Sequence, residues 1–128
     1  MSKKAIKTLS APNPVGPYSQ AMAVGPFLFC SGQIAIDPKT NEVKASAPVQ
    51  EQAKLVMENI KAVLSANSMN FSHVVKTTIY LADMNDFAAV NDVYGSYMVE
   101  PYPARSTVAV KTLPKNVTVE VEVTAYKE

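Results

Sequence analysis

The chain has 128 residues, a formal net charge of +1, 48% hydrophobic residues and 18% charged residues. This size and balance predict a single globular domain over residues 1–128 and exclude an intrinsically disordered chain. A protein that grips nucleic acid through its phosphates normally carries a basic patch, so the balanced charge argues against such a partner.

The single cysteine, Cys30, excludes an intramolecular disulfide and a cysteine-based zinc site. His73 is the only histidine, so we expect no metal site. No apolar run approaches the roughly 20 residues that span a bilayer. Residues 1–9 lack the apolar core of a signal peptide. We therefore expect no membrane contact and a location in the cytoplasm or an organelle matrix.

The predicted elements begin around a proline-rich loop. A short strand is expected at residues 5–9, and residues 10–18 hold three prolines, which fix φ and remove backbone donors. Two strands follow, at residues 19–24 and 27–36, with Gly25-Pro26 as the turn between them. The sequence Asp-Pro-Lys-Thr-Asn then predicts another turn, at residues 37–41.

Apolar residues recur three or four apart between residues 46 and 67, which predicts an amphipathic helix. Ser46 is its expected N-terminal cap, and Asn67 is expected in the left-handed conformation at its end. A second helix is predicted at residues 85–98. Gly95 inside it costs about 1 kcal/mol relative to alanine, so tertiary packing must hold that end.

Three further stretches rich in β-branched and aromatic residues predict strands: residues 74–81, 104–110 and 117–126. The resulting order, β-β-α-β-α-β-β, predicts an α+β fold with two helices on one face of a sheet. Phe27 and Phe29 point to the side opposite Leu28, so both sheet faces carry apolar groups. Soluble monomers rarely expose such a face, so we expect a partner subunit to cover it.

Arg105 begins an apolar strand, and its guanidinium offers a rigid fork of donors that suits a carboxylate. The alternative is a structural salt bridge to Glu120 or Glu122 on a neighbouring strand, and the residues alone favour it. The two glutamates alternate with valines and share one strand face. Such a pair can divide acid and base work or can simply be solvated.

Weaker signals lie elsewhere along the chain. Ser31-Gly32 interrupts an apolar strand, which indicates either close approach of a ligand or a β-bulge. Asn91 falls on the apolar stripe of the second helix and needs a polar partner, in a neighbouring loop or a ligand. Tyr18 closes the proline-rich loop, as a pocket lid or as loop packing. Taken alone, these residues specify no reaction.

Several short segments occur in a fixed order: Gly-Pro-Tyr18-Ser-Gln, Ser31-Gly-Gln-Ile34, Val75-Lys-Thr-Thr78, Asn85-Asp-Phe87, Val90-Asn91, Pro103-Ala-Arg-Ser106 and Leu113-Pro114. This series resembles the reactive intermediate deaminase A (RidA, or YjgF) family from about residue 11 to the C-terminus. The resemblance implies a chorismate-mutase-like α+β fold, a homotrimer with sites between subunits, and no cofactor.

The resemblance also implies an activity in metabolite damage control. This activity is the hydrolysis of enamine and imine acids, such as 2-aminoacrylate, 2-iminopropanoate and 2-iminobutanoate, to 2-keto acids and ammonia. Arg105 matches the arginine that binds the substrate carboxylate, and Glu120 matches the glutamate that orients or activates water. The matched positions that line or support the pocket are Tyr18, Ser31, Gly32 and Asn91.

Thr107 is also expected among the substrate-binding residues, although it departs from the family pattern, in which many members have cysteine at this position. Direct addition of water to an electrophilic imine carbon needs no thiol, so we still expect hydrolysis. Two alternatives stay open. One is a regulatory trimer that binds small carboxylates without chemistry. The other is an RNA-directed role as a translation inhibitor or ribonuclease, against which the balanced charge counts.

Overall fold

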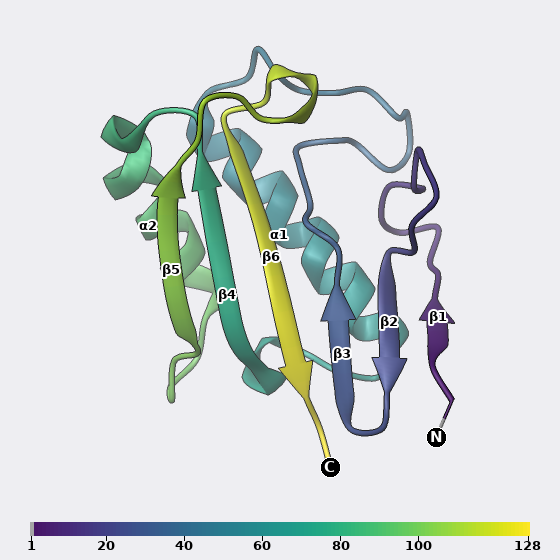
Figure 1. Cartoon of the computed structure of the whole chain (residues 1–128). Helices are drawn as coiled ribbons and strands as arrows, with labels where there is room; N and C mark the ends of the chain where they lie inside the picture. The colour runs from purple at the N-terminus through teal and green to yellow at the C-terminus, as the bar shows by residue number, and fades with distance from the viewer. Residues whose placement is uncertain (1) are drawn as a thin grey trace.

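The computed structural model describes residues 2–128 as one mixed sheet with two helices behind it (Figure 1). Its elements in chain order are β1 (Lys4–Ile6), β2 (Ala21–Val24), β3 (Phe27–Cys30), α1 (Val49–Ala66), β4 (Val74–Leu81), α2 (Phe87–Tyr97), β5 (Ala104–Ala109) and β6 (Val119–Tyr126). Short 3₁₀ turns precede three of them, at Phe71–His73, Met84–Asp86 and Pro114–Asn116. The predicted α+β class and the two helices on one face are confirmed.

The strands lie in the order β1-β2-β3-β6-β4-β5, so the C-terminal strand runs through the middle of the sheet. Only the pair of β4 and β5 is parallel, and the other neighbours are antiparallel. A parallel pair needs a crossover connection, and α2 provides it. The crossover places α2 on the same face as α1, behind β4 and β5 in Figure 1.

The core lies between the helices and this face of the sheet. Alternate residues of β6 are buried, beginning with Val119 and Val121. The apolar stripe of α1 is buried against them, as its spacing predicts, and includes Val56, Ile60 and Leu64. Each large side chain buried in this way contributes about 1.5–3 kcal/mol.

The ends of α1 differ from the prediction. The helix begins after Pro48 with no side-chain cap. The Gln52 amide donates to the carbonyls of Ala45 and Ala47, in the turn before the helix. Ser46 is therefore not the cap. Asn67 has a φ of −112°, and the left-handed residue is Ser68, with a φ of 58°. A side chain four residues into the helix holds the preceding turn, which capping rules alone do not anticipate.

One strand prediction needs correction in its bounds, and a bulge interrupts the alternation of another strand, whose bounds are as predicted. The strand predicted at residues 27–36 ends at Cys30, after which Gln33 forms an isolated bridge to Val121. In β4 the register shifts between Val74 and Lys76, so Val74 is buried and Val75 is exposed. The extra residue of such a bulge reverses the alternation that a regular strand would keep.

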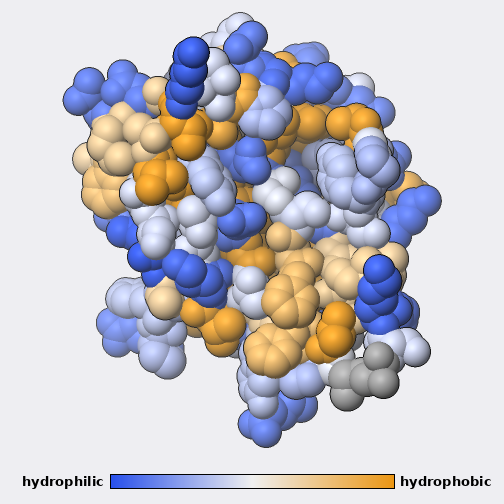
Figure 2. All heavy atoms as spheres, viewed as in Figure 1, coloured by the Kyte–Doolittle hydropathy of each residue, from blue (hydrophilic) through white to orange (hydrophobic). Residues whose placement is uncertain are grey.

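The face of the sheet away from the helices is open in the single chain. Phe27 and Phe29 are 40% and 49% exposed there, and the ring of Tyr126 packs edge-on against Phe27. Figure 2 looks onto this face and shows apolar side chains gathered in its lower middle, over the lower ends of β3 and β6. The predicted apolar face is present, and its covering subunit stays a prediction.

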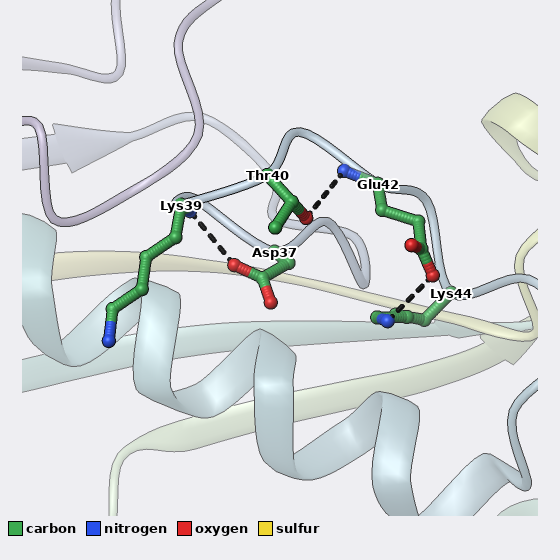
Figure 3. A network of polar contacts seen from close by, with 5 residues as sticks. All are labelled: Asp37, Lys39, Thr40, Glu42 and Lys44. Atoms are coloured by element: carbon green, nitrogen blue, oxygen red, sulfur yellow. Dashed lines mark hydrogen bonds and ion pairs between the residues drawn. The ribbon is translucent and has the colours of Figure 1, made fainter.

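The turn predicted at residues 37–41 is confirmed and is held by polar contacts (Figure 3). The carboxylate of Asp37 accepts from the backbone N–H of Lys39 at 2.8 Å, and the Thr40 hydroxyl accepts from that of Glu42 at 3.2 Å. Lys44 pairs with Glu42 at 2.6 Å. These charges satisfy one another, so the cluster is a stabilised turn.

Candidate functional site

Arg105 lies on the helix-covered face of the sheet. It stands beside Thr77 in the parallel β4–β5 register, and the Thr77 hydroxyl hydrogen-bonds the Tyr94 hydroxyl of α2 at 2.8 Å. The guanidinium Nη1 donates to Asn91 Oδ1 at 2.6 Å. Its Cζ lies 5.1 Å from the ring centroid of Tyr94 and 5.5 Å from that of Phe87. Neutral groups therefore hold the cation in place.

This arrangement overturns the structural salt bridge that the residues alone favour. Strand β4 lies between β5 and β6, so Arg105 and the two glutamates are not on neighbouring strands. The ion pair formed within residues 2–128 joins Lys44 to Glu42 instead. Arg105 lines an open cavity of about 500 Å³ together with Asn91, Tyr94 and Tyr102. Its remaining donors can bind an anion there.

Glu120 belongs to a second cavity, of about 450 Å³, on the open face. The cavity brings Glu120 together with Tyr18, Ser31 and Gly32, as the resemblance implies. Glu120 stands opposite Tyr80 across the β4–β6 ladder, and Tyr80 is three residues from Thr77 on β4. Successive strand residues alternate between faces, so Glu120 and Arg105 lie on opposite faces of the sheet.

Gly32 gives the Glu120 carboxylate its space. A Cβ placed on Gly32 would collide with Oε2 of Glu120 and would lie 3.0 Å from Cδ and 3.2 Å from Cγ. The group that approaches Gly32 is therefore the side-chain carboxylate of Glu120, which is neither of the predicted alternatives, a ligand or a bulge. The strand has already ended at Cys30, so the glycine is not a bulge within it.

The proline-rich loop is fixed to the sheet at two points. The Ser31 hydroxyl donates to the Ser19 carbonyl at 2.6 Å. The buried Gln20 amide accepts from Thr8 N–H at 2.7 Å and donates to the carbonyls of Thr8, Ala11 and Pro12. Tyr18 stands half-exposed at the end of this loop, in the cavity wall. The wall around Glu120 is thus built before any ligand arrives.

The electrostatics around Glu120 favour a proton acceptor stronger than an ordinary glutamate. Burial raises the pKa of Glu120, and the nearby carboxylate of Glu122 raises it further. The Tyr80 hydroxyl donates to Glu122 Oε1 at 2.7 Å and makes no such bond to Glu120. A carboxylate with a raised pKa can take a proton from water and return it.

The other sequence candidates have plainer surroundings. Cys30 is partly buried against the core, and burial raises the pKa of its thiol to about 12, which favours a small hydrophobe over a nucleophile. His73 Nδ1 accepts from Asn70 N–H and caps a 3₁₀ turn. The Thr107 hydroxyl is buried without a hydrogen-bond partner within residues 2–128, and Thr107 lines neither cavity.

Two residues of the Glu120 cavity escape sequence reasoning. Gln20 lines it while anchoring the loop, and a lone glutamine beside a strand carries no signal for that role. Lys115 lines it from a 3₁₀ turn in which Lys115 and Asn116 have φ values of 60° and 59°. The sequence Leu-Pro-Lys-Asn at residues 113–116 predicts a turn here, but two successive left-handed residues without glycine are rare, so the sequence does not predict this backbone conformation.

No grouping of three or more His, Cys, Asp or Glu side chains suited to a metal ion occurs within residues 2–128. Across the same residues, no helix combines the length and apolar character needed to cross a membrane.

Known proteins resemble this chain over nearly its whole length. The endoribonuclease L-PSP family model matches residues 8–127. A RutC family protein of Pyrococcus horikoshii is 52% identical, over 98% of this chain and 99% of its own. A 2-iminobutanoate/2-iminopropanoate deaminase of Dermatophagoides farinae is 46% identical, over 94% and 93%.

A solved structure of a relative has the same fold as this chain. Escherichia coli TdcF with bound serine superposes with a TM-score of 0.91 at 40% identity, covering 98% of this chain and 99% of its own. Both the ordering of the six strands and the two helices thus fit a known architecture. The chain belongs to the endoribonuclease L-PSP family, which is the RidA/YjgF family that its motifs resemble.

Proposed function

We propose that this protein hydrolyses small 2-imino and 2-enamine carboxylic acids to 2-keto acids and ammonia. The observation that carries the proposal is a guanidinium that lines a cavity and is held by Asn91, Tyr94 and Phe87 rather than by an acid. Such a cation is available to a ligand carboxylate. The deaminase name of the mite relative supports the reaction class, and the serine bound to TdcF supports a small amino-acid-like ligand.

Each site is proposed to combine two copies of the chain. Arg105 and Glu120 lie on opposite sheet faces, so one chain cannot present both to a small acid. The cavity of Arg105 must therefore meet the cavity of Glu120 on a neighbouring copy. A contact between two different patches is heterologous, and it closes into a ring when the rotation permits. A homotrimer is the ring that we propose, and it covers the open face bearing Phe27 and Phe29.

The proposed mechanism uses Arg105 to fix the carboxylate and thereby orient the C=N carbon. Glu120 holds a water molecule and accepts its proton as the oxygen bonds to that carbon. Glu120 passes this proton to nitrogen, which gives a carbinolamine. A second proton then moves from the carbinolamine hydroxyl to nitrogen through Glu120, so that the C–N bond breaks and ammonia leaves as the carbonyl forms. No step needs a thiol, a metal or a cofactor. Thr107 lies two residues beyond Arg105 on the same strand face and takes no part in these steps.

The test generates 2-iminobutanoate in situ with an amino-acid oxidase and follows its disappearance. We expect turnover by the wild type, nearly complete loss in Arg105→Ala and a large loss in Glu120→Gln. Lys39→Ala removes an exposed cation from the turn at residues 37–41 and is the matched control, with an unchanged rate. Equal rates for the wild type and Arg105→Ala would reject the site.

Arg105 is the only arginine in the sequence, which allows a second check without mutation. An arginine-selective dicarbonyl reagent should modify one position per chain, as read by mass spectrometry, and abolish turnover. A bound 2-keto acid should slow this modification. Protection without any turnover would support the regulatory, carboxylate-binding alternative, and native mass spectrometry reports the number of chains in the assembly.

A ribonuclease is the second candidate, because the matching family model is named for an endoribonuclease. The only histidine lies in a capped 3₁₀ turn and lines neither cavity, so acid–base cleavage of RNA lacks its usual side chain there. Incubation with labelled single-stranded RNA separates the two proposals. Cleavage that disappears in Arg105→Ala would favour the ribonuclease.

A further inference from the structure

We infer that Glu122, held by the Tyr80 hydroxyl, is a positioning residue that sets the proton affinity of Glu120. The catalytic consequence of this inference rests on the proposed function, whereas the electrostatic relation between the two glutamates does not. The inference concerns two side chains outside the cavity that contains Glu120, since neither Tyr80 nor Glu122 lines it.

The geometry places the two carboxylates on one face with different partners. Glu120 and Glu122 are two residues apart on β6, and the residues opposite them on β4 are Tyr80 and Thr78. Tyr80 does not bond to Glu120, the residue directly across the ladder. Its hydroxyl reaches diagonally and donates to Glu122 Oε1 at 2.7 Å. One carboxylate therefore has a hydroxyl donor, and the other lacks it.

This asymmetry assigns the two acids different tasks. The Tyr80 hydroxyl bond holds the Glu122 carboxylate in one place beside Glu120. A carboxylate held so close disfavours a negative charge on Glu120, which is also partly buried. Burial first, and Glu122 second, raise the pKa of Glu120. Environments that push the pKa values of two neighbouring acids apart commonly make one acid the proton carrier and leave the other as a fixed charge.

The other charged and titratable groups near Glu120 do not cancel this effect. Lys115 of the 3₁₀ turn and Tyr18 of the proline-rich loop share its cavity, and both are exposed to solvent, which screens them. Lys76 of β4 lines a different hollow with Glu122 and donates to the Ser106 hydroxyl at 3.3 Å. At the proposed contact between two copies, Arg105 of the neighbouring copy binds the substrate carboxylate.

A stronger base is an advantage in the proposed reaction. Glu120 has to remove a proton from water and then deliver one to the departing nitrogen, and both steps are efficient when its proton affinity lies closer to the working pH. Without Glu122, the same carboxylate would hold its proton less tightly. It would then activate water less well while still occupying the same place in the cavity.

The experiment titrates the glutamate side-chain carboxyl carbons of ¹³C-glutamate-labelled protein by NMR, with Glu120→Gln used to assign the Glu120 signal. In Glu122→Gln we expect the titration midpoint of Glu120 to move to lower pH. Tyr80→Phe, which keeps both acids but frees Glu122 to swing into water, should move it in the same direction by less. An unchanged midpoint in Glu122→Gln would overturn the inference.

The chain offers a matched control in a second tyrosine–glutamate pair. The Tyr97 hydroxyl of α2 donates to Glu58 Oε2 of α1 at 2.7 Å, away from both cavities. Glu58→Gln removes the charge of one carboxylate that accepts from a tyrosine hydroxyl, as Glu122→Gln does, and should leave the midpoint of Glu120 where it was. A shift as large in Glu58→Gln would mean that net charge, not Glu122, controls Glu120.

Activity supplies a readout that separates the two proposals. In an active enzyme, the acid limb of the kcat profile should move to lower pH in Glu122→Gln, so that this variant keeps a larger fraction of its plateau rate at low pH. A shifted NMR midpoint in a protein that hydrolyses no imine would reject the proposed function and support the inference. Turnover with an unshifted midpoint would do the reverse.

Discussion

At the scale of single residues, the availability of Arg105 depends on the neutrality of its partner. A carboxylate in place of Asn91 would form an ion pair and compete with any ligand acid for the same donors. An amide oxygen accepts one hydrogen bond at 2.6 Å and leaves the positive charge uncompensated. The aromatic faces of Tyr94 and Phe87 steady the cation by cation–π attraction without neutralising it.

The position of the Glu120 carboxylate depends on the free space beside Gly32, and Gly32→Ala tests this dependence. The added methyl group must displace the Glu120 carboxylate, because that carboxylate is the movable partner in the collision. A misplacement of about 1 Å in a catalytic group can cost on the order of 100-fold in rate. We expect a loss of this size in kcat with little change in the melting temperature, measured by the oxidase-coupled assay and by thermal unfolding.

Gly16→Ala is the control for this substitution. Gly16 lies in the proline-rich loop. A Cβ there meets only Tyr18 ring carbons at 3.7 Å, an ordinary contact. Its rate should match the wild type. If Gly32→Ala also kept the wild-type rate, the position of the Glu120 carboxylate would have no bearing on turnover.

At the scale of elements, α2 carries a glycine where the helix does not need one. A Cβ on Gly95 meets nothing within 4 Å in the single chain, and the residue lies inside Phe87–Tyr97. Glycine costs a helix about 0.5–1 kcal/mol relative to alanine. Gly95→Ala should therefore raise the free energy of unfolding by about that amount, as measured by urea denaturation. A loss of stability would show instead that a neighbouring copy fills the space beside Gly95.

The elements show what local sequence can and cannot predict. The helical stripe of α1 and the alternation of β6 follow from spacing alone, because each depends on one periodic face. The bulge at Val74 and the strand ending at Cys30 depend on pairing with β6, which lies far along the chain. The order of strands is a long-range property as well. Local sequence does not specify the strand order, so the residues alone allow Arg105 to lie on a strand next to the glutamates. In the structure, β4 lies between those two strands.

At the scale of the whole molecule, the sheet separates the two cavities that the proposed function would bring together between copies. The cation and its cavity lie under α2, and the base and its cavity lie on the open face. Resemblance identified the residues, yet only the register of β4 with β5 and β6 assigns them to opposite faces. Assembly and activity are therefore coupled in the proposed function. Each contact between two copies, or seam, would join the Arg105 cavity of one copy (the Arg105 half) to the Glu120 cavity of the next (the Glu120 half).

Mixing two inactive variants tests this coupling directly. Arg105→Ala keeps the Glu120 half and Glu120→Gln keeps the Arg105 half, so each homogeneous assembly lacks one half at every seam. Co-expression with two affinity tags selects mixed assemblies, and each mixed trimer of the proposed ring brings two intact halves together at about one seam in three. We expect the mixture to recover about that fraction of the wild-type rate. If one chain supplied both groups to its own site, the mixed assemblies would stay as inactive as their parents, because no intact pair could form.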